Sequence, residues 1–166
     1  MVENKVWEVV PRLEVPKGTR AINSTWACKK KSNGMLRGRL NARGLKQVEG
    51  VHYDGSSIHS PVTNVATIWI AMTLMLMAMW VGHLTDIHGA FLHGKLEEGE
   101  EIFMEVPQGF KKHYPGDVVL RMLRIIYGLK QAAMAFWQEL LKCMRSMGMT
   151  QSTADPCLYS SGQVTD

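Results

Sequence analysis

Cysteines are few in this sequence, and its first residues lack the pattern of a secretory signal. The 166 residues contain three widely spaced cysteines, Cys28, Cys143 and Cys157, and this spacing argues against a disulfide framework or a cysteine-based zinc knuckle. The first ten residues, MVENKVWEVV, mix apolar and charged side chains and do not resemble a secretory signal. Because 46% of the residues are hydrophobic, the chain can bury a core. We therefore expect one intracellular globular domain, or a large piece of one.

Acidic residues are missing from residues 15–48. This segment carries nine of the 19 basic residues: Lys17, Arg20, Lys29, Lys30, Lys31, Arg37, Arg39, Arg43 and Lys46. The rest of the chain holds ten basic and fifteen acidic residues, a net charge of −5, against +4 for the whole. A separate basic block suits a polyanionic partner such as nucleic acid or a nucleotide phosphate. The alternative is a solvated cationic face without a partner.

Charged residues are also missing from residues 60–82, a stretch long enough to cross a bilayer. Against a membrane span, the stretch begins with Pro61, Thr63 and Asn64, and methionine, an adaptable filler of soluble cores, supplies much of its apolar character. An all-round apolar helix is buried, in lipid or in protein. We predict a buried helix at about residues 65–80, with a single-span membrane protein as the alternative.

Several catalytic motifs are missing as well. The sequence has no Walker loop, no dinucleotide-type glycine fingerprint after a strand and no Gly-x-Ser-x-Gly, which leaves NTPase, Rossmann and serine hydrolase functions without support. Asp86, His88 and His93 span a predicted strand and turn and match no zinc pattern, so we expect the two histidines at the surface of a turn. The acidic loop around Gly99 contains Glu97, Glu98, Glu100 and Glu101, and we expect it to be solvated.

A basic β-hairpin is the clearest local feature that is present. Asn33-Gly34 separates two strand-like runs, which is a strong signal for a hairpin turn. The second run, residues 35–45, alternates Arg37, Arg39, Asn41 and Arg43 with Leu36, Leu40 and Ala42. Side chains on one face of a strand lie about 6.6 Å apart, so the arginines could follow a phosphate chain. A charged, solvent-exposed edge strand is the alternative.

The remaining pattern predicts a compact α+β unit. Strands are expected at residues 3–10 and 20–31 around a Pro-Lys-Gly turn, at 82–87, 101–107 and 117–128, and at 157–161 after the Asp155-Pro156 turn. A further strand is expected to start at residue 164. Residues 130–148 predict a helix whose apolar stripe, expected in the core, consists of Ala133, Phe136, Trp137, Leu140, Met144 and Met147.

Asp86 is the carboxylate that stands out. It lies at the end of the predicted strand 82–87, in LTDIHGAFLHG. Phosphoryl transfer at two magnesium ions needs several bridging carboxylates, because the ions repel each other. Asp86 can supply one of them, so the motif provides about one third of such a site.

Four ordered motifs identify a family resemblance. RGRLNARGLKQVEGVHYD, TDIHGAFLHGKLEEGEEIFMEVPQGF, YGLKQAAMAFW and DPCLY occur in this order, and with them the chain resembles the reverse transcriptase domain of copia-type retrotransposons from end to end. The resemblance implies the right-hand polymerase fold, with an antiparallel sheet packed on helices. It places fingers strands and the basic hairpin at about residues 1–60, and an incomplete palm with supporting helices at about residues 61–166.

The resemblance also assigns the predicted metal site and the sugar gate. Asp86 matches the first of the family's three metal-binding aspartates, and the carbonyl of Ile87 would be a further ligand for one of two Mg²⁺ ions. Phe91 takes the place of the aromatic that crowds the sugar 2′ position. The other two aspartates belong to a Tyr-x-Asp-Asp hairpin expected shortly after residue 164, and neither Asp155 nor Asp166 can replace them. We therefore expect the chain by itself to be inactive.

For the incoming nucleotide, the resemblance points to the hairpin and to the turn before the last long helix. Lys31 and Arg39 match fingers residues that grip the triphosphate, with Arg43 beside them. Tyr127 and Gly128 would line the nucleotide pocket. The implied partners are dNTPs, an RNA template and the RNA/DNA hybrid, with no membrane, in a cytoplasmic retrotransposon particle; the oligomeric state stays open.

The sequence also departs from the family pattern. Trp69 occupies a position usually held by arginine, Ala133 and Met134 replace a Pro-Arg pair, and Arg37-Gly38 replaces Lys-Ala. These changes suggest a decayed or domesticated copy, so a non-catalytic nucleic-acid-binding remnant is the alternative function.

Overall fold

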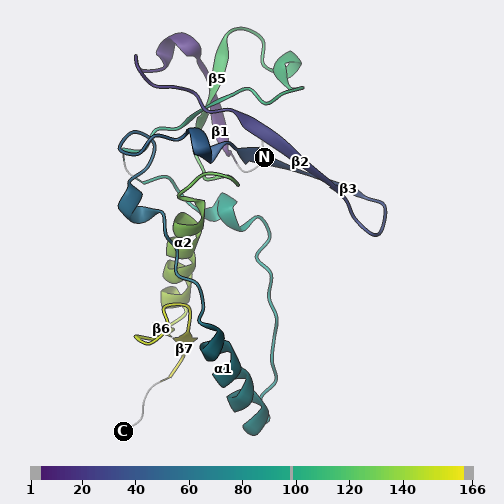
Figure 1. The fold of residues 1–166 in the computed structure, drawn as a ribbon, viewed down its shortest axis with the longest axis vertical. Coiled ribbons are helices and arrows are strands. Elements are labelled where there is room, and N and C mark those ends of the chain that lie inside the picture. The colour runs from purple at the N-terminus through teal and green to yellow at the C-terminus, as the bar shows by residue number, and fades with distance from the viewer. Residues whose placement is uncertain (1–4, 98, 163–166) are drawn as a thin grey trace.

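The structure is a computed structural model that describes residues 5–97 and 99–162. It is an α+β fold with two α-helices and three small antiparallel sheets (Figure 1). The strands are β1 (Trp7–Pro11), β2 (Ser24–Lys30), β3 (Leu36–Ala42), β4 (Phe103–Glu105), β5 (Val118–Met122), β6 (Thr150–Gln151) and β7 (Tyr159–Ser160). The helices are α1 (Val65–Met77) and α2 (Ala132–Ser146). The fold class predicted from the sequence is confirmed at this level.

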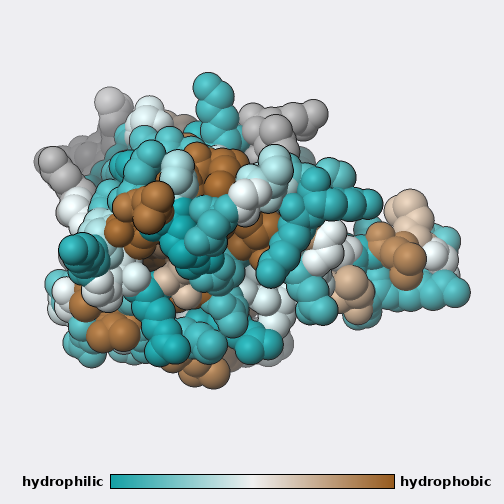
Figure 2. Space-filling view, turned by 90° about the horizontal axis from the view of Figure 1, so that it is seen from above, coloured by the Kyte–Doolittle hydropathy of each residue, from teal (hydrophilic) through white to brown (hydrophobic). Residues whose placement is uncertain are grey.

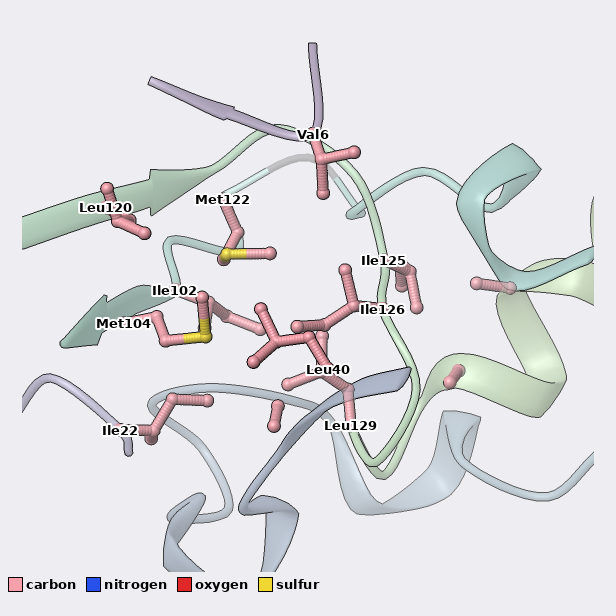
Figure 3. Packing of buried hydrophobic residues seen from close by; sticks show 13 residues of the cluster. Val6, Ile22, Leu40, Ile102, Met104, Leu120, Met122, Ile125, Ile126 and Leu129 are labelled. Atoms are coloured by element: carbon pink, nitrogen blue, oxygen red, sulfur yellow. The ribbon is translucent and has the colours of Figure 1, made fainter. Parts of the chain in front are cut away.

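The core lies on the sheet β1-β5-β4. β5 is the central strand and pairs with both neighbours in antiparallel register, with Val9 opposite Leu120 and Met104 opposite the same residue. Figure 3 shows apolar side chains from this sheet packing against the segment between β5 and α2, where Ile125 and Ile126 are fully buried. β1 does not pair with β2, although a single turn separates the two in the sequence-based prediction. Instead, Ile22, just before β2, forms an isolated bridge to Met104.

β2 and β3 form the predicted basic hairpin. They pair from Ser24 opposite Ala42 to Lys30 opposite Leu36, and Gly34 adopts the left-handed conformation (φ 80°) that the turn requires. Figure 1 shows the hairpin projecting from the rest of the molecule, and its arm mixes hydrophilic and hydrophobic side chains in Figure 2. β3 is shorter than the predicted strand 35–45, because a 3₁₀ turn forms at Gly44–Lys46.

The apolar helix α1 begins where predicted, but it is not buried. The side chain of Asn64 caps it by accepting the N–H of Ala66 (2.9 Å), yet none of its residues is buried. Figure 1 shows α1 standing away from the central sheet. The prediction of a core helix is therefore wrong for the described residues, because α1 is exposed apart from the partly buried Thr67 and Met75. No helix in the described part is long and apolar enough to cross a membrane.

α2 packs with only part of its predicted apolar stripe. Its buried residues are Ala132 and Ala135, near its start, and Met147 at the far end is 55% exposed. Several stripe residues instead line a hollow with Phe91 and the segment before α1. The prediction that the whole stripe is core is therefore wrong: the helix runs beyond the edge of the sheet that could cover it.

A short hairpin, β6-β7, follows α2. The predicted strand at residues 157–161 is found as Tyr159–Ser160, whereas its partner Thr150–Gln151 was not predicted. The predicted strand at residue 164 and Asp166 lie outside the described residues. Asp155 is a turn residue, as predicted, and its buried carboxylate accepts the backbone N–H of Asn64 (2.9 Å) and of Cys157 (2.8 Å). It therefore joins the start of α1 to the turn before β7.

Candidate nucleotide and nucleic-acid binding site

Asp86 lies in an exposed loop. The predicted strand 82–87 does not form: residues 80–87 have no regular secondary structure, and Leu84 is fully exposed. A strand needs a hydrogen-bonded neighbour, and no described strand pairs with this segment. The two histidines that follow are exposed, as predicted, and within the described ranges no group of three His, Cys, Asp or Glu side chains is arranged to hold a metal.

After Asp86 and Ile87 the chain turns sharply into the 3₁₀ helix Ala90–His93. Gly89 makes this turn with φ 64°. The turn directs Phe91 toward the core, where its ring meets the ring of Tyr127 edge to face, at 4.7 Å between centroids. Phe91 contacts Phe136 of α2 in the same way, at 6.2 Å. The aromatic predicted as a sugar gate is therefore fixed from two sides.

Arg39 and Tyr127, two residues predicted to bind the nucleotide, meet in the structure. The guanidinium carbon of Arg39 lies over the Tyr127 ring, 5.3 Å from its centroid, within the range of a cation–π interaction. Since Tyr127 also contacts Phe91, the three side chains form a continuous series from β3 to the 3₁₀ helix after Asp86.

A cleft of about 490 Å³ opens beside this series. Its polar lining comes from β3 and from the turn after Asp86, while its other wall is aromatic; the lining includes Arg37, Arg39, His88, Tyr127, Trp7, Trp26, Phe110 and Tyr114. Trp26 of β2 stacks on Phe110 (5.4 Å between centroids) and donates its Nε1–H to the carbonyl of Gln108 (3.3 Å). The cleft thus combines exposed cations with flat aromatic surfaces, which suits a nucleotide or nucleic acid.

The end of β3 and the turn at Tyr127-Gly128 are in direct backbone contact. The N–H of Ala42 donates to the carbonyl of Tyr127 (2.7 Å). A Cβ added to Gly128, which has φ 89°, would collide with the carbonyl oxygen of Ala42, and one added to Gly44 would collide with the carbonyl oxygen of Gly128. Glycine is therefore required at both positions for the hairpin to lie this close to the turn.

The other two predicted cations lie at opposite ends of the hairpin region. Arg43 is exposed and lines a second hollow, of about 570 Å³, with Lys46, Lys130 and Gly128. Lys31 lies in the distal turn, where its N–H donates to the carbonyl of Met35 (2.8 Å). The structure thus groups Arg39 with Tyr127 and Arg43 with Gly128, while Lys31 stands apart.

A buried polar network beside this turn was missed from the sequence. Gln47 and Gln131 are about 95% buried and bonded to each other through their side-chain amides (2.9 Å). Gln131 also donates to Glu100 (3.2 Å), so the prediction that the whole acidic loop is solvated is wrong for Glu100; Glu98 lies outside the described residues. Burial raises the pKa of the Glu100 carboxyl, and the hydrogen bond from Gln131 opposes this effect. Glutamine at these positions carries no sequence signal of burial.

Comparison with known proteins shows the family of the chain. Residues 4–166 match the family model described as reverse transcriptase (RNA-dependent DNA polymerase). The chain belongs to the reverse transcriptase family. Similar proteins are Pol polyproteins of plant transposons, and they support the copia-type resemblance seen in the sequence.

Two such relatives of this reverse transcriptase sequence illustrate the coverage. The retrovirus-related Pol polyprotein from transposon TNT 1-94 of Nicotiana tabacum is 33% identical over 152 residues, which cover 89% of this chain. The one from transposon RE2 of Arabidopsis thaliana is 32% identical over 163 residues, or 95% of this chain. In both cases the match spans 11% of the relative's length. No solved structure gives a significant match.

Proposed function

We propose that this chain is the nucleotide- and template-binding part of a retrotransposon RNA-directed DNA polymerase, with fingers and an incomplete palm. The observation that carries the proposal is the contact between Arg39 and Tyr127 at the edge of the aromatic cleft. It joins a cation of the basic hairpin to the turn before α2, and both residues were predicted to bind the nucleotide. In the parent reaction, a primer 3′-hydroxyl attacks the α-phosphate of a dNTP and pyrophosphate leaves.

The cationic residues of the site would act by holding phosphate oxygens. Arginine presents a planar fork of N–H donors that matches a phosphate better than the point charge of lysine. Arg37 and Arg39 are exposed at the cleft, so their donors are free to face a triphosphate or a nucleic-acid backbone. Arg43, with Lys46 and Lys130, would extend the cationic surface past Gly128.

The described residues do not by themselves fit a pair of magnesium ions. Asp86 is one exposed carboxylate in a loop, and the described part of the chain holds no cluster of three possible ligands. Two closely spaced cations need more anionic oxygens than this. For the described residues we therefore propose binding rather than the chemical step, in the setting of a retrotransposon particle.

Primer extension tests the assignment to binding alone. The purified 166-residue chain is incubated with a primed RNA template, dNTPs and Mg²⁺, and the products are resolved on a denaturing gel. We expect no extension above that of an Asp86→Asn variant prepared in parallel. Extension by the wild-type chain that is lost in Asp86→Asn would overturn the claim.

A non-catalytic nucleic-acid-binding protein is the second candidate function, favoured by the departures from the family pattern at Trp69 and at Ala133-Met134. It shares the basic hairpin but not the nucleotide pocket. Binding of a free dNTP therefore separates the two: the polymerase assignment predicts dNTP binding that depends on Arg39 and Tyr127, whereas the alternative predicts binding of polynucleotides only.

A further inference from the structure

We propose that Gln47 and Gln131 are positioning residues, which together hold the base of the basic hairpin against the Tyr127-Gly128 turn. The Nε2–H of Gln47 donates to Oε1 of Gln131 (2.9 Å), and both side chains are buried. Gln47 lies one residue after the 3₁₀ turn that ends the hairpin, and Gln131 immediately precedes α2. The amide pair, defined as these two side chains, therefore bridges the two halves of the proposed nucleotide site, and the inference rests on that proposed function.

Each end of the amide pair is fixed by backbone groups. Oε1 of Gln47 accepts the N–H of Lys130 (2.8 Å), two residues after Gly128. Nε2 of Gln131 donates to the carbonyl of His52 (3.0 Å). Gln131 is the residue before α2, yet its side chain makes no capping bond to the helix. Its amide therefore bonds to Gln47 and to His52, in other segments of the chain, and does not cap its own helix.

The pair also has a defined direction. Donation runs from Gln47 to Gln131, and from Gln131 to the carbonyl of His52 and to the carboxylate of Glu100 (3.2 Å). An acceptor-only group at position 131 would face these two oxygens without a proton. A buried polar group left without its partner costs more than the bond itself contributes. The orientation of both amides is therefore set by their surroundings, which makes the pair a rigid spacer.

The amide pair affects the cleft through Ala42, at the end of β3. The N–H of Ala42 donates to the carbonyl of Tyr127 (2.7 Å), and the close approach of Gly44 to Gly128 leaves no room for a side chain. Displacing Gln47 would draw the end of β3 away from Tyr127 and separate Arg39 from its ring. The core sheet, which includes the bond from the Met122 N–H to the carbonyl of Ile102 (2.8 Å), does not depend on the pair.

Gln131→Glu tests this proposal, because a protonated carboxylic acid has the same shape as the amide and keeps one acceptor and one donor, whereas the ionised form is an acceptor only. The ionisable residues around the amide pair and its partners are Glu100, His52 and Lys130, with Tyr53 bonded to Lys130 and with Asp54 and Glu97 near Glu100. Comparing every variant with the wild type at the same pH corrects for the titration of those groups that do not contact position 131. Gln131→Leu lacks the polar groups at any pH.

Gln138→Glu is the matched control, since Gln138 also lies on α2 and donates to a glutamate, Glu97 (3.4 Å), but is only half-buried. The readouts are amide-exchange protection at Lys130 and Ala42, with Met122 as the reference, and affinity for an RNA/DNA hybrid. At pH 8 we expect Gln131→Glu to lose ~10-fold or more in protection at both amides and ~5-fold in affinity, on the scale of one lost buried hydrogen bond. At pH 5 both should return to within ~2-fold of the wild type.

Gln131→Leu should lose protection at Lys130 and Ala42 and affinity for the hybrid at both pH values. Gln138→Glu should lose neither at either pH. The amide of Met122 should keep its protection in all variants. The proposal is overturned if Gln131→Glu equals the wild type at pH 8, or if it is equally impaired at pH 5 and pH 8. Should the wild-type chain fail to bind hybrid at all, the proposed function fails, and the protection of Lys130 and Ala42 still decides whether the amide pair positions the turn.

Discussion

The guanidinium of Arg39 lies over the ring of Tyr127, 5.3 Å from its centroid, although 88 positions separate the two residues in the chain. The contact joins the basic hairpin to the turn before α2. Tyr127 also contacts Phe91, with 4.7 Å between the ring centroids. A cation held on an aromatic face loses less conformational freedom when a phosphate binds. This relationship is the basis of the proposed nucleotide pocket.

Substitutions at this contact should change dNTP affinity in a graded order. Arg39→Ala should weaken binding ~10-fold or more, because it removes a charge-assisted phosphate contact, and Arg39→Lys should lie between it and the wild type. Tyr127→Leu should lower dNTP affinity ~2- to 5-fold, the scale of an exposed cation–π contact. Tyr127→Phe keeps the ring and should leave the affinity unchanged. Titration of a fluorescent dNTP measures all four. Equal affinity of Arg39→Ala and the wild type would remove Arg39 from the pocket.

Gly128→Ala should destabilise the fold more than a glycine substitution with similar backbone strain. Gly128 and Gly109 have φ of 89° and 88°, but a Cβ at Gly128 would collide with the carbonyl oxygen of Ala42, while Gly109 has open space. We expect Gly109→Ala to lower the free energy of unfolding by about 1 kcal/mol, because of the left-handed conformation alone. Gly128→Ala should lower it clearly more. Urea unfolding followed by circular dichroism compares them, and equal losses would show that the close approach to β3 is not essential.

Stability should fall on acidification through the Asp155 carboxyl. Hydrogen bonds from Thr67, and then from the N–H groups of Cys157 and Asn64, lower the pKa of Asp155. A carboxyl with a lowered pKa in the folded state stabilises the fold fully above its unfolded pKa, about 3.9, and loses this contribution as the pH falls through the folded value. Urea midpoints between pH 6 and pH 2 should therefore drop less steeply in Asp155→Asn than in the wild type. Parallel curves would contradict the assignment.

The exposed face of α1 should bind hydrophobic dyes. Trp69 is 64% exposed and Leu76, two turns further along, is 69% exposed. Contiguous exposed apolar surface of this kind binds other apolar molecules. Replacing both with glutamine should lower the fluorescence of a bound dye such as ANS without lowering the urea midpoint, because neither residue belongs to the core. Leu13→Gln, at a 99% exposed position, is the control and should leave the dye signal unchanged. An unchanged signal in the double variant would show that α1 is covered in solution.

Local patterns predicted the elements of this fold better than their packing. The hairpin at Asn33-Gly34 and the helices followed from turn chemistry and apolar periodicity, because both are set by neighbouring residues. The predicted strand 82–87 is absent, since no described strand pairs with it. Helix α1 is not buried, since the described residues provide no surface that covers it. Similarly, Arg39 and Tyr127 were identified one by one from motifs, while their contact and the pair Gln47–Gln131 depend on tertiary geometry that no motif encodes.

Binding of a labelled RNA/DNA hybrid as a function of salt tests the central claim most directly. Three proteins are compared: the wild-type chain, a variant with Arg37, Arg39 and Arg43 changed to Gln, and a charge-matched control with Lys95, Lys142 and Arg145 changed to Gln. The account predicts that affinity falls with increasing salt in the wild type and the control, and that the hairpin variant binds ~10-fold or more weakly with a shallower salt dependence, because phosphate contacts are lost. If the hairpin variant binds as tightly as the control, the basic hairpin is not a nucleic-acid surface and the account is wrong.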